Sequence, residues 1–165
     1  MINDRVTVIS NSWTSCEDQV SAADAAAIDA VLATAAAAGI TVLNATGDSG
    51  STCTNGSANV IGVPSDSPNA TAVGGTTLTF GPGYTYGSET WWGQSATSAA
   101  EGRGGFGVSR YFRTPAYQTA LNPGAFRSVP DVSIPADPAS GTFICQASAG
   151  GCPTGLAYGG TSYSA

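Results

Sequence analysis

The pattern of apolar and polar residues predicts a strand, a helix and a second strand near the start of the chain. Residues 6–10 (VTVIS) are a short apolar, β-branched run typical of a buried strand. Within residues 21–38, apolar side chains recur at the spacing of one helix face: Ile28, Val31, Leu32 and Ala35. Residues 40–43 (ITVL) then predict a second buried strand. The segment is therefore predicted to form a βαβ unit with parallel strands.

The two ends of this helix carry recognisable signals. Ser21 and Asp24 have the spacing of a capping pair, in which a side-chain oxygen accepts a hydrogen bond from the first helical turn. Gly39 stands where a glycine with a left-handed backbone often ends a helix. These signals predict a helix that begins and ends close to residues 21 and 38.

The rest of the chain is richer in turn residues. Residues 47–70 read as long loops, 71–75 as a short strand, and 81–107 as loops and edge strands. A short helix is expected at 115–121, and residues 129–132 are expected to return to the sheet. No repeat or linker separates a second domain, so we predict one α/β domain, a parallel sheet flanked by helices, over residues 1–165.

Composition narrows the function. The five basic residues are all Arg, there is no His, and eleven acidic residues give a net charge of −6. Nucleic-acid binding requires clustered positive charge, which the chain lacks. No apolar run approaches the ~20 residues that span a bilayer, so no membrane partner is expected. A chain without Lys or His gains little positive charge on acidification, which suits an acidic medium, although a solvated extracellular surface explains the composition nearly as well.

The four cysteines form an even set with three possible pairings: Cys16, Cys53, Cys145 and Cys152. Cys145 and Cys152 flank a short run of small residues, which makes a natural disulfide loop. We favour the bridges Cys145–Cys152 and Cys16–Cys53 and an oxidising, extracellular location, with free buried thiols as the alternative. Without His or a Cys-x-x-Cys spacing, no metal site is predicted.

Two glycine-flanked segments carry the candidate chemistry. Gly47-Asp48-Ser49-Gly50 follows the second strand, where ligands bind in open parallel sheets. Gly159-Gly160-Thr161-Ser162 can place a hydroxyl at a strand-to-helix turn, where backbone N–H groups favour a developing oxyanion. Each segment alone is better explained as a turn or a helix cap than as a reactive site.

Taken together and in order, these segments resemble the sedolisins, serine-carboxyl peptidases with a subtilisin-like fold. The resemblance extends over almost the entire chain and is carried by ordered motifs: 8–13 (VISNSW), 39–50 (GITVLNATGDSG), 71–76 (TAVGGT), 104–109 (GGFGVS) with Phe112 and Pro115, 127–133 (RSVPDVS) with 136–138 (ADP), and 159–162 (GGTS). The resemblance implies a serine-type endopeptidase that acts on proteins or peptides at acidic pH.

The resemblance also implies roles for single residues. Ser162 corresponds to the nucleophile, and Asp48 to a carboxyl group that, if buried and kept protonated, donates a hydrogen bond to the oxyanion. Ser12, Trp13 and Gly160 correspond to substrate-binding positions, although Trp13 can equally be a core residue. The remaining acidic candidates, Asp131 and Asp137, each adjoin a proline and are interpreted as structural.

One departure from the family limits this hypothesis. The general base and its partner acid of sedolisins form a Glu-x-x-x-Asp pair, upstream of the first matching strand. Here the residues four positions after Glu17, Glu89 and Glu101 are Ser or Gly. The family's Ca²⁺ site lies downstream of the nucleophile, beyond residue 165. We therefore expect a partial catalytic domain, incomplete at both ends, that is inactive alone and contains no metal or other cofactor.

Other functions remain compatible with the sequence. A His-dependent subtilisin is the nearest enzymatic alternative, and a secreted Gly/Ser/Thr-rich binding module belongs to a different class. A catalytically dead sedolisin homologue is a third possibility. Only an enzyme is expected to depend on Ser162 and on acidic pH, and we expect it to be secreted and monomeric.

Overall fold

The computed structural model describes residues 2–52, 57–94, 102–140, 143–152 and 157–165. Within them, the strands are β1 (Val8–Asn11), β2 (Ser15–Cys16), β3 (Thr41–Ala45), β4 (Gly62–Val63), β5 (Thr71–Phe80), β6 (Tyr86–Trp91), β7 (Gly107–Arg113), β8 (Phe126–Val129) and β9 (Val132–Pro135). The α-helices are α1 (Ala22–Ala37) and α2 (Thr161–Ser164). Short 3₁₀ helices are η1 (Ile2–Asp4), η2 (Glu17–Gln19), η3 (Pro82–Tyr84), η5 (Ala116–Gln118), η6 (Pro138–Ser140) and η7 (Ala147–Ala149).

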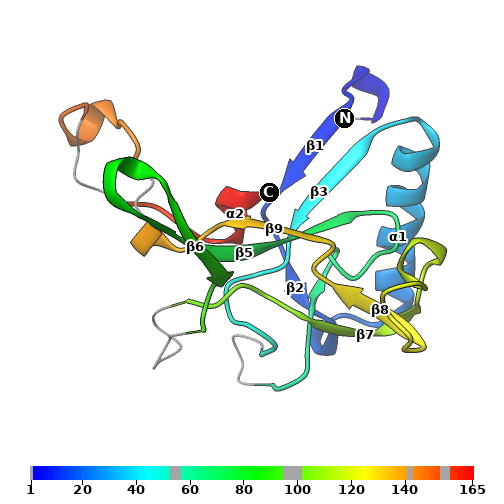
Figure 1. Cartoon of the computed structure of the whole chain (residues 1–165). Helices are drawn as coiled ribbons and strands as arrows, with labels where there is room; N and C mark the ends of the chain where they lie inside the picture. Colours follow the sequence, from blue (N-terminus) through cyan, green and yellow to red (C-terminus); the bar gives the residue numbers. More distant parts are fainter. Residues whose placement is uncertain (1, 53–56, 95–101, 141–142, 153–156) are drawn as a thin grey trace.

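The described part of the chain contains a five-stranded sheet with a parallel core. Strands β1, β3 and β5 lie side by side and parallel, and β9 pairs with β5 in the same direction. The fifth strand, β6, is antiparallel to the second half of β5. Two small antiparallel pairs, β2 with β4 and β7 with β8, lie outside this sheet. The predicted βαβ unit is confirmed, because α1 connects the parallel strands β1 and β3 (Figure 1).

Helix α1 has the predicted capping signals and buries only part of the predicted face. The Ser21 hydroxyl accepts a hydrogen bond from the Asp24 backbone N–H at 3.1 Å, and Gly39 follows with a φ of +76°. The helix packs on the sheet through Ala35 and Leu32, against Ile40 and Val42. Ile28 and Val31 of the predicted face are exposed. Helical spacing alone does not indicate which of two adjacent stripes meets the sheet, and small alanines let the backbone approach more closely.

Helix α2 covers the sheet face opposite to α1. Alternation along the strands places Val42 and Ala72 on the face that α1 covers and Gly75 on the other. A Cβ atom at Gly75 would contact the Thr161 side chain of α2 at 3.5 Å. The two helices accordingly lie at different sides of the parallel strands in Figure 1.

Three other sequence predictions have different outcomes. The predicted strand 71–75 is part of the longer β5, which continues to Phe80 and pairs with β6. The helix expected at 115–121 is only the 3₁₀ turn η5. Val129 and Val132 return to the sheet region as the end of β8 and the start of β9. No helix in the described ranges is long and apolar enough to cross a membrane.

The disulfide Cys145–Cys152 is present and flanks η7, as predicted. The second predicted bridge, Cys16–Cys53, involves Cys53, which lies outside the described residues, so this pairing stays a prediction. No cysteine in the described ranges is a free thiol, so the free-thiol alternative is wrong there.

Candidate active site

The fold brings Asp48 and the turn before Ser162 together, although they are far apart in sequence. Asp48 follows β3 in the chain, and Ser162 lies in the first turn of α2, which packs against β3, β5 and β9. Because parallel strands end at the same edge of a sheet, loops that follow different strands meet there. The two glycine-flanked segments of the sequence therefore form one site.

The Asp48 carboxylate is fixed by Thr161. Its Oδ1 atom accepts hydrogen bonds from the Thr161 backbone N–H at 2.7 Å and from the Thr161 hydroxyl at 2.8 Å. The same hydroxyl accepts a hydrogen bond from the Gly47 backbone N–H at 3.0 Å. Thr161 is fully buried, so these short, partly charge-assisted bonds are sheltered from competing water. Thr161 thus determines how the Asp48 loop sits against α2.

Gly160 has a backbone that requires glycine. Its φ is +107°, a conformation that residues with a side chain rarely adopt. A Cβ atom at this position would also lie 2.8 Å from Asp48 Oδ2. The absent side chain therefore leaves space for the second carboxyl oxygen of Asp48.

Ser162 and Ser12 meet at the surface of the site. The Ser12 hydroxyl donates a hydrogen bond to the Ser162 backbone carbonyl at 3.3 Å, which links the loop after β1 to α2. Both residues are exposed. Within the described part of the chain, the Ser162 hydroxyl itself forms no hydrogen bond. Trp13, next to Ser12, is 84% exposed, so the interpretation of Trp13 as a core residue is wrong.

Asp48 lies between two hollows. A cavity of about 180 Å³ is lined by Asp48 together with residues of β2 and β4, and a shallower one of about 310 Å³ is lined by Asp48, Trp92, Gly159 and Gly160. Asp48 is consequently exposed. The hypothesis of a neutral Asp48 assumed that the residue is buried, and this part is wrong because the turn of α2 contacts the carboxylate from one side only.

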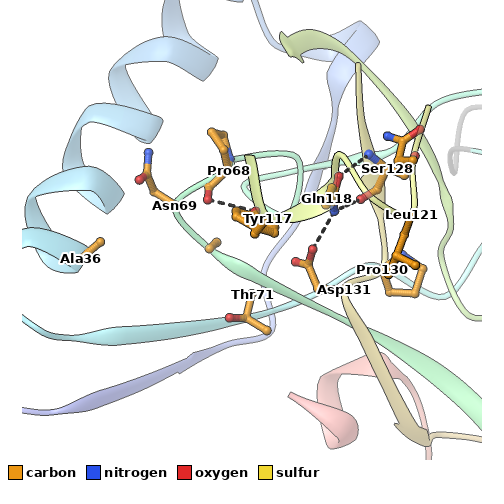
Figure 2. A pocket seen from close by; sticks show the side chains of 12 residues that line it. Ala36, Pro68, Asn69, Thr71, Tyr117, Gln118, Leu121, Ser128, Pro130 and Asp131 are labelled. Carbon is orange, nitrogen blue, oxygen red and sulfur yellow. Dashed lines mark hydrogen bonds between the residues drawn. The ribbon is translucent and has the colours of Figure 1, made fainter. Parts of the chain in front are cut away.

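A larger cavity lies away from these hollows. It has a volume of about 650 Å³ and is enclosed between Ala36 of α1, the loop 68–71 and the segment from Tyr117 to Asp131 (Figure 2). None of the candidate site residues lines it. Cavity size therefore does not identify the candidate active site. We locate it instead by the hydrogen bonds between Asp48 and the turn that precedes Ser162.

The whole chain, residues 1–165, matches the sequence model of the subtilase family. The chain belongs to the subtilase family. Among curated relatives, kumamolisin of Bacillus sp. (strain MN-32) is 40% identical over 146 residues, and sedolisin of Pseudomonas sp. (strain 101) is 36% identical over 151 residues. These matches cover 82% and 85% of this subtilase chain. The chain spans 25% of the length of each of these two relatives.

A solved structure agrees with this assignment. Pseudomonas sedolisin, a serine-carboxyl proteinase complexed with two molecules of pseudo-iodotyrostatin, matches 98% of this subtilase chain with a TM-score of 0.82 and 33% sequence identity. The match covers 45% of the sedolisin chain. The predicted subtilisin-like α/β fold and the resemblance to sedolisins are thereby confirmed.

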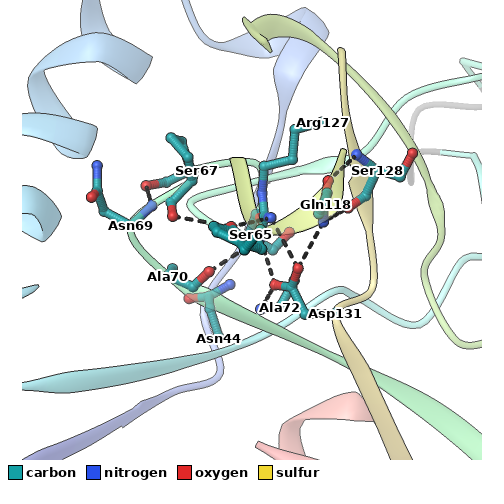
Figure 3. A network of polar contacts seen from close by, with 12 residues as sticks. Asn44, Ser65, Ser67, Asn69, Ala70, Ala72, Gln118, Arg127, Ser128 and Asp131 are labelled. Carbon is teal, nitrogen blue, oxygen red and sulfur yellow. Dashed lines mark hydrogen bonds and ion pairs between the residues drawn. The ribbon is translucent and has the colours of Figure 1, made fainter. Parts of the chain in front are cut away.

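A buried ion pair between Arg127 and Asp131 connects strands of this subtilase. Arg127 is fully buried and donates to both carboxylate oxygens of Asp131, at 3.0 and 2.6 Å (Figure 3). Asp131 also accepts hydrogen bonds from the Ala72 backbone N–H at 2.7 Å and from the Gln118 side chain at 2.8 Å. The pair thus connects β8, the start of β5 and η5, and Asp131 is structural, as predicted. Asp137 is similarly engaged by the Thr77 hydroxyl at 2.7 Å.

The described residues of this subtilase assemble no calcium site. No three His, Cys, Asp or Glu side chains come together in them. Among residues whose positions the structure gives, the buried carboxyl group without a donor is Asp66. Its acidic neighbour there is Glu17, whereas Ca²⁺ takes six to eight oxygen ligands. The Ca²⁺ expected for the complete enzyme was assigned to residues beyond Ala165, and it stays a prediction.

The sequence analysis missed the role of Thr161 and the buried pair Glu17 and Asp66. Thr161 directly precedes Ser162, and a hydroxyl next to a nucleophile motif was a signal for a positioning role. Glu17 and Asp66 carry no local signal, because the fold rather than the spacing brings them together.

Proposed function

We propose that this chain is part of the catalytic domain of a serine-type endopeptidase that hydrolyses proteins or peptides in acidic medium. The observation that carries the proposal is the fixation of Asp48 by two hydrogen bonds from Thr161, in the turn that presents Ser162. A carboxyl group held by the turn that presents a serine, on a chain of the subtilase family, favours acyl transfer with a charged intermediate.

In the proposed reaction, the Ser162 hydroxyl oxygen attacks the carbonyl carbon of the scissile peptide bond. The hydroxyl proton passes to a base. The carbonyl carbon becomes tetrahedral, and the carbonyl oxygen becomes an oxyanion. The backbone N–H of Ser162, at the start of α2, supplies one donor to this oxyanion, and Asp48 supplies the other.

The two carboxyl oxygens of Asp48 have different roles in this proposal. Oδ1 already accepts two hydrogen bonds from Thr161, so a proton on the carboxyl group belongs on Oδ2. Oδ2 lies at the space that Gly160 leaves open. Because Asp48 is exposed, acidic solvent rather than burial has to supply this proton.

Acidic pH also determines the kind of base. A histidine is protonated at pH 4 and cannot accept the serine proton, whereas a carboxylate remains basic in this range. The Ser162 hydroxyl has no hydrogen-bond partner among the described residues, so a Glu outside them is the expected base. The 165 residues alone are therefore expected to be inactive.

Substrate binding is proposed for the exposed surface around Ser162. Ser12 and Trp13 border it, Gly160 gives access to Asp48, and the hollows on both sides of Asp48 can accept substrate side chains. The disulfide Cys145–Cys152 supports an extracellular location. We further propose that the complete enzyme is a monomer that binds Ca²⁺ and has neither nucleic acid nor a membrane as partner.

Peptide hydrolysis by the intact protein, its pH optimum and its dependence on Ser162 separate this proposal from the alternative functions. Ser162→Ala is expected to lower kcat/KM for peptide hydrolysis by about a thousandfold or more, with wild-type activity highest below about pH 5. A wild-type protein that binds peptides without cleaving them would identify a catalytically dead homologue or a binding module. Activity that peaks at neutral pH would favour a His-dependent subtilisin.

A further inference from the structure

Two acidic side chains with no part in the proposed mechanism are buried together. Glu17 of η2 is fully buried, and Asp66, three residues after β4, is 1% exposed. Neither carboxyl oxygen of Asp66 receives a hydrogen bond from an N–H or O–H donor in the described part of the chain. A buried charge without a donor or cation is very unfavourable, so Asp66 needs either a partner or a proton.

The pairing of β2 with β4 brings the two carboxyl groups together. Cys16 pairs with Gly62, and the backbone N–H groups of Glu17 and Asp66 donate to the carbonyls of Ile61 and Gly62 at 3.0 and 2.9 Å. The side chains of Glu17 and Asp66, both buried, are thereby neighbours that interact directly. Two carboxylates only accept hydrogen bonds, so this contact requires a proton on one of them.

The surroundings decide which of the two holds the proton. The Glu17 carboxylate accepts hydrogen bonds from the Ser109 hydroxyl at 2.6 Å and from the Arg110 backbone N–H at 3.0 Å, which stabilise its charge. Asp66 has no such donors. Glu17 is therefore the charged member, and Asp66 is the member that donates its proton.

The two arginines near this pair hydrogen-bond to other groups and not to Asp66. Arg127 of β8 acts on Asp66 from a distance, but its guanidinium binds both oxygens of Asp131. The Arg110 side chain of β7 donates to the Asn59 carbonyl at 3.4 Å. Burial first, and then the charge of Glu17, raise the pKa of Asp66 from 3.8 to about 8, against the smaller opposing effect of Arg127.

We propose that Asp66 and Glu17 form a proton-sharing carboxyl pair that fastens β4 to η2 at acidic pH and releases it as the pH rises. On release, the Asp66 proton passes to solvent and leaves two adjacent buried carboxylates that repel each other. Strands β2 and β4, which directly precede η2 and the Asp66 turn in the chain, line the 180 Å³ cavity beside Asp48. Loss of the pair thus opens a wall of this cavity, and only this last step rests on the proposed function.

The sign of the effect follows from proton binding. The raised pKa means that the folded protein binds one proton more than the unfolded chain between about pH 4 and pH 8. Stability is greatest at low pH and falls through this window. One bound proton corresponds to a tenfold increase in the unfolding equilibrium constant per pH unit, on the order of 10⁴-fold at most over the window.

The first test compares the intact wild-type protein with Asp66→Asn. The amide can donate to Glu17 at every pH, so the variant keeps the contact without a titrating proton. Urea unfolding between pH 4.5 and 8.5 is expected to show that the wild-type unfolding constant, relative to that of the variant, rises up to tenfold per pH unit. A pH-independent ratio would overturn the proposal. Glu89→Gln, at an exposed acid on β6, is the matched control and should leave the wild-type slope unchanged.

Infrared spectroscopy tests the proton directly and does not depend on unfolding or activity. At pH 6 the wild-type protein should show the C=O band of a protonated carboxylic acid, which Asp66→Asn lacks and which disappears above about pH 8. Absence of this band overturns the pair. Stabilisation of the wild type by added Ca²⁺, lost in Asp66→Asn, would also overturn it, because a cation would then bridge the carboxylates.

Kinetics test the link to the cavity. In Asp66→Asn, the part of the KM rise toward neutral pH that comes from release of the pair should be absent, with a smaller change in kcat. An unchanged KM profile beside a normal infrared titration overturns the link and leaves the pair intact. If the wild-type protein hydrolyses no peptide at all, the proposed function fails, and the unfolding and infrared results still decide whether the pair exists.

Discussion

At the scale of single residues, the contacts of Asp48 bear on the donor role that we propose for it, because the residue is exposed. Thr161 occupies Oδ1 with two hydrogen bonds, so the carboxyl group has a defined orientation and one remaining oxygen. That oxygen faces the glycine at position 160. Orientation and protonation are thus separate requirements of the proposed role, and the contacts of Thr161 meet the first.

Substitution of Asp48 by Asn separates these requirements. The amide oxygen can take the place of Oδ1 and the NH₂ group the place of a protonated Oδ2, so Asp48→Asn mimics the neutral acid at every pH. We expect the variant to retain much of the wild-type kcat at acidic pH and to lose less activity toward neutral pH. Asp48→Ala is expected to lower kcat by about 10²–10³-fold.

Peptide hydrolysis by the intact protein between pH 3 and 7 measures both effects. Equal losses in Asp48→Asn and Asp48→Ala would contradict a donor role for Asp48. They would indicate instead that the negative charge is needed.

Thr161 provides a second prediction at this scale. Thr161→Val keeps the shape of the side chain but removes the hydroxyl that bonds Asp48 and Gly47. Because Thr161 is buried, loss of its hydroxyl should lower the free energy of unfolding by about 1–3 kcal/mol, measured by urea denaturation. Thr161→Ser retains the hydroxyl and serves as the control. A Val variant as stable as wild type would show that these bonds only position Asp48.

At the scale of elements, the sequence was informative where a local signal determines structure. The apolar runs at residues 6–10 and 40–43 and the capping residues Ser21 and Gly39 predicted β1, α1 and β3 to within a few residues. The motifs that contain Asp48 and Ser162 predicted that these residues share one edge of the sheet, and they do.

Features that depend on long-range contacts escaped prediction. The helical spacing could not show that Ile28 and Val31 of the predicted face stay exposed. Leu32 and Ala35 of the same face pack on the sheet. The exposure of Asp48 depends on the space left around it by β2, β4 and the loop near Trp92. A sequence motif specifies which residues come together but not how much solvent reaches them.

The ion pair of Arg127 and Asp131 leads to a prediction about the stability of the elements that it connects. Asp131→Asn leaves the guanidinium of Arg127 buried without its counter-charge, so the free energy of unfolding should fall by about 3–5 kcal/mol. Asp137→Asn, at a partly exposed position, should cost far less. Thermal or urea unfolding of both variants measures the difference. Similar losses in the two variants would contradict the bracing role of Arg127 and Asp131.

At the scale of the whole molecule, the two outer parallel strands and α2 expose apolar side chains: Val8, Val132, Ile134 and Tyr163. Val8 belongs to β1 at one side of the parallel strands, and Val132 and Ile134 belong to β9 at the other. Unpaired strand edges with apolar side chains favour association with other chains.

We therefore expect residues 1–165, expressed without any further sequence, to self-associate. Sedimentation velocity should show oligomers or aggregates that increase with protein concentration. Val132→Thr combined with Ile134→Thr should reduce this association, whereas Thr79→Ser on the paired strand β5 is a control that should not. A monodisperse monomer with cooperative unfolding would contradict this expectation.

The burial of Arg127 has a practical consequence for limited proteolysis. The chain has no lysine, so a trypsin-like protease can cut only after its five arginines. The peptide bond after Arg127 is protected as long as the β8 side chain stays buried, because the protease must bind the guanidinium in its own specificity pocket. The fragment that ends at Arg127 can therefore serve as a gel-based reporter of how often this part of the molecule opens.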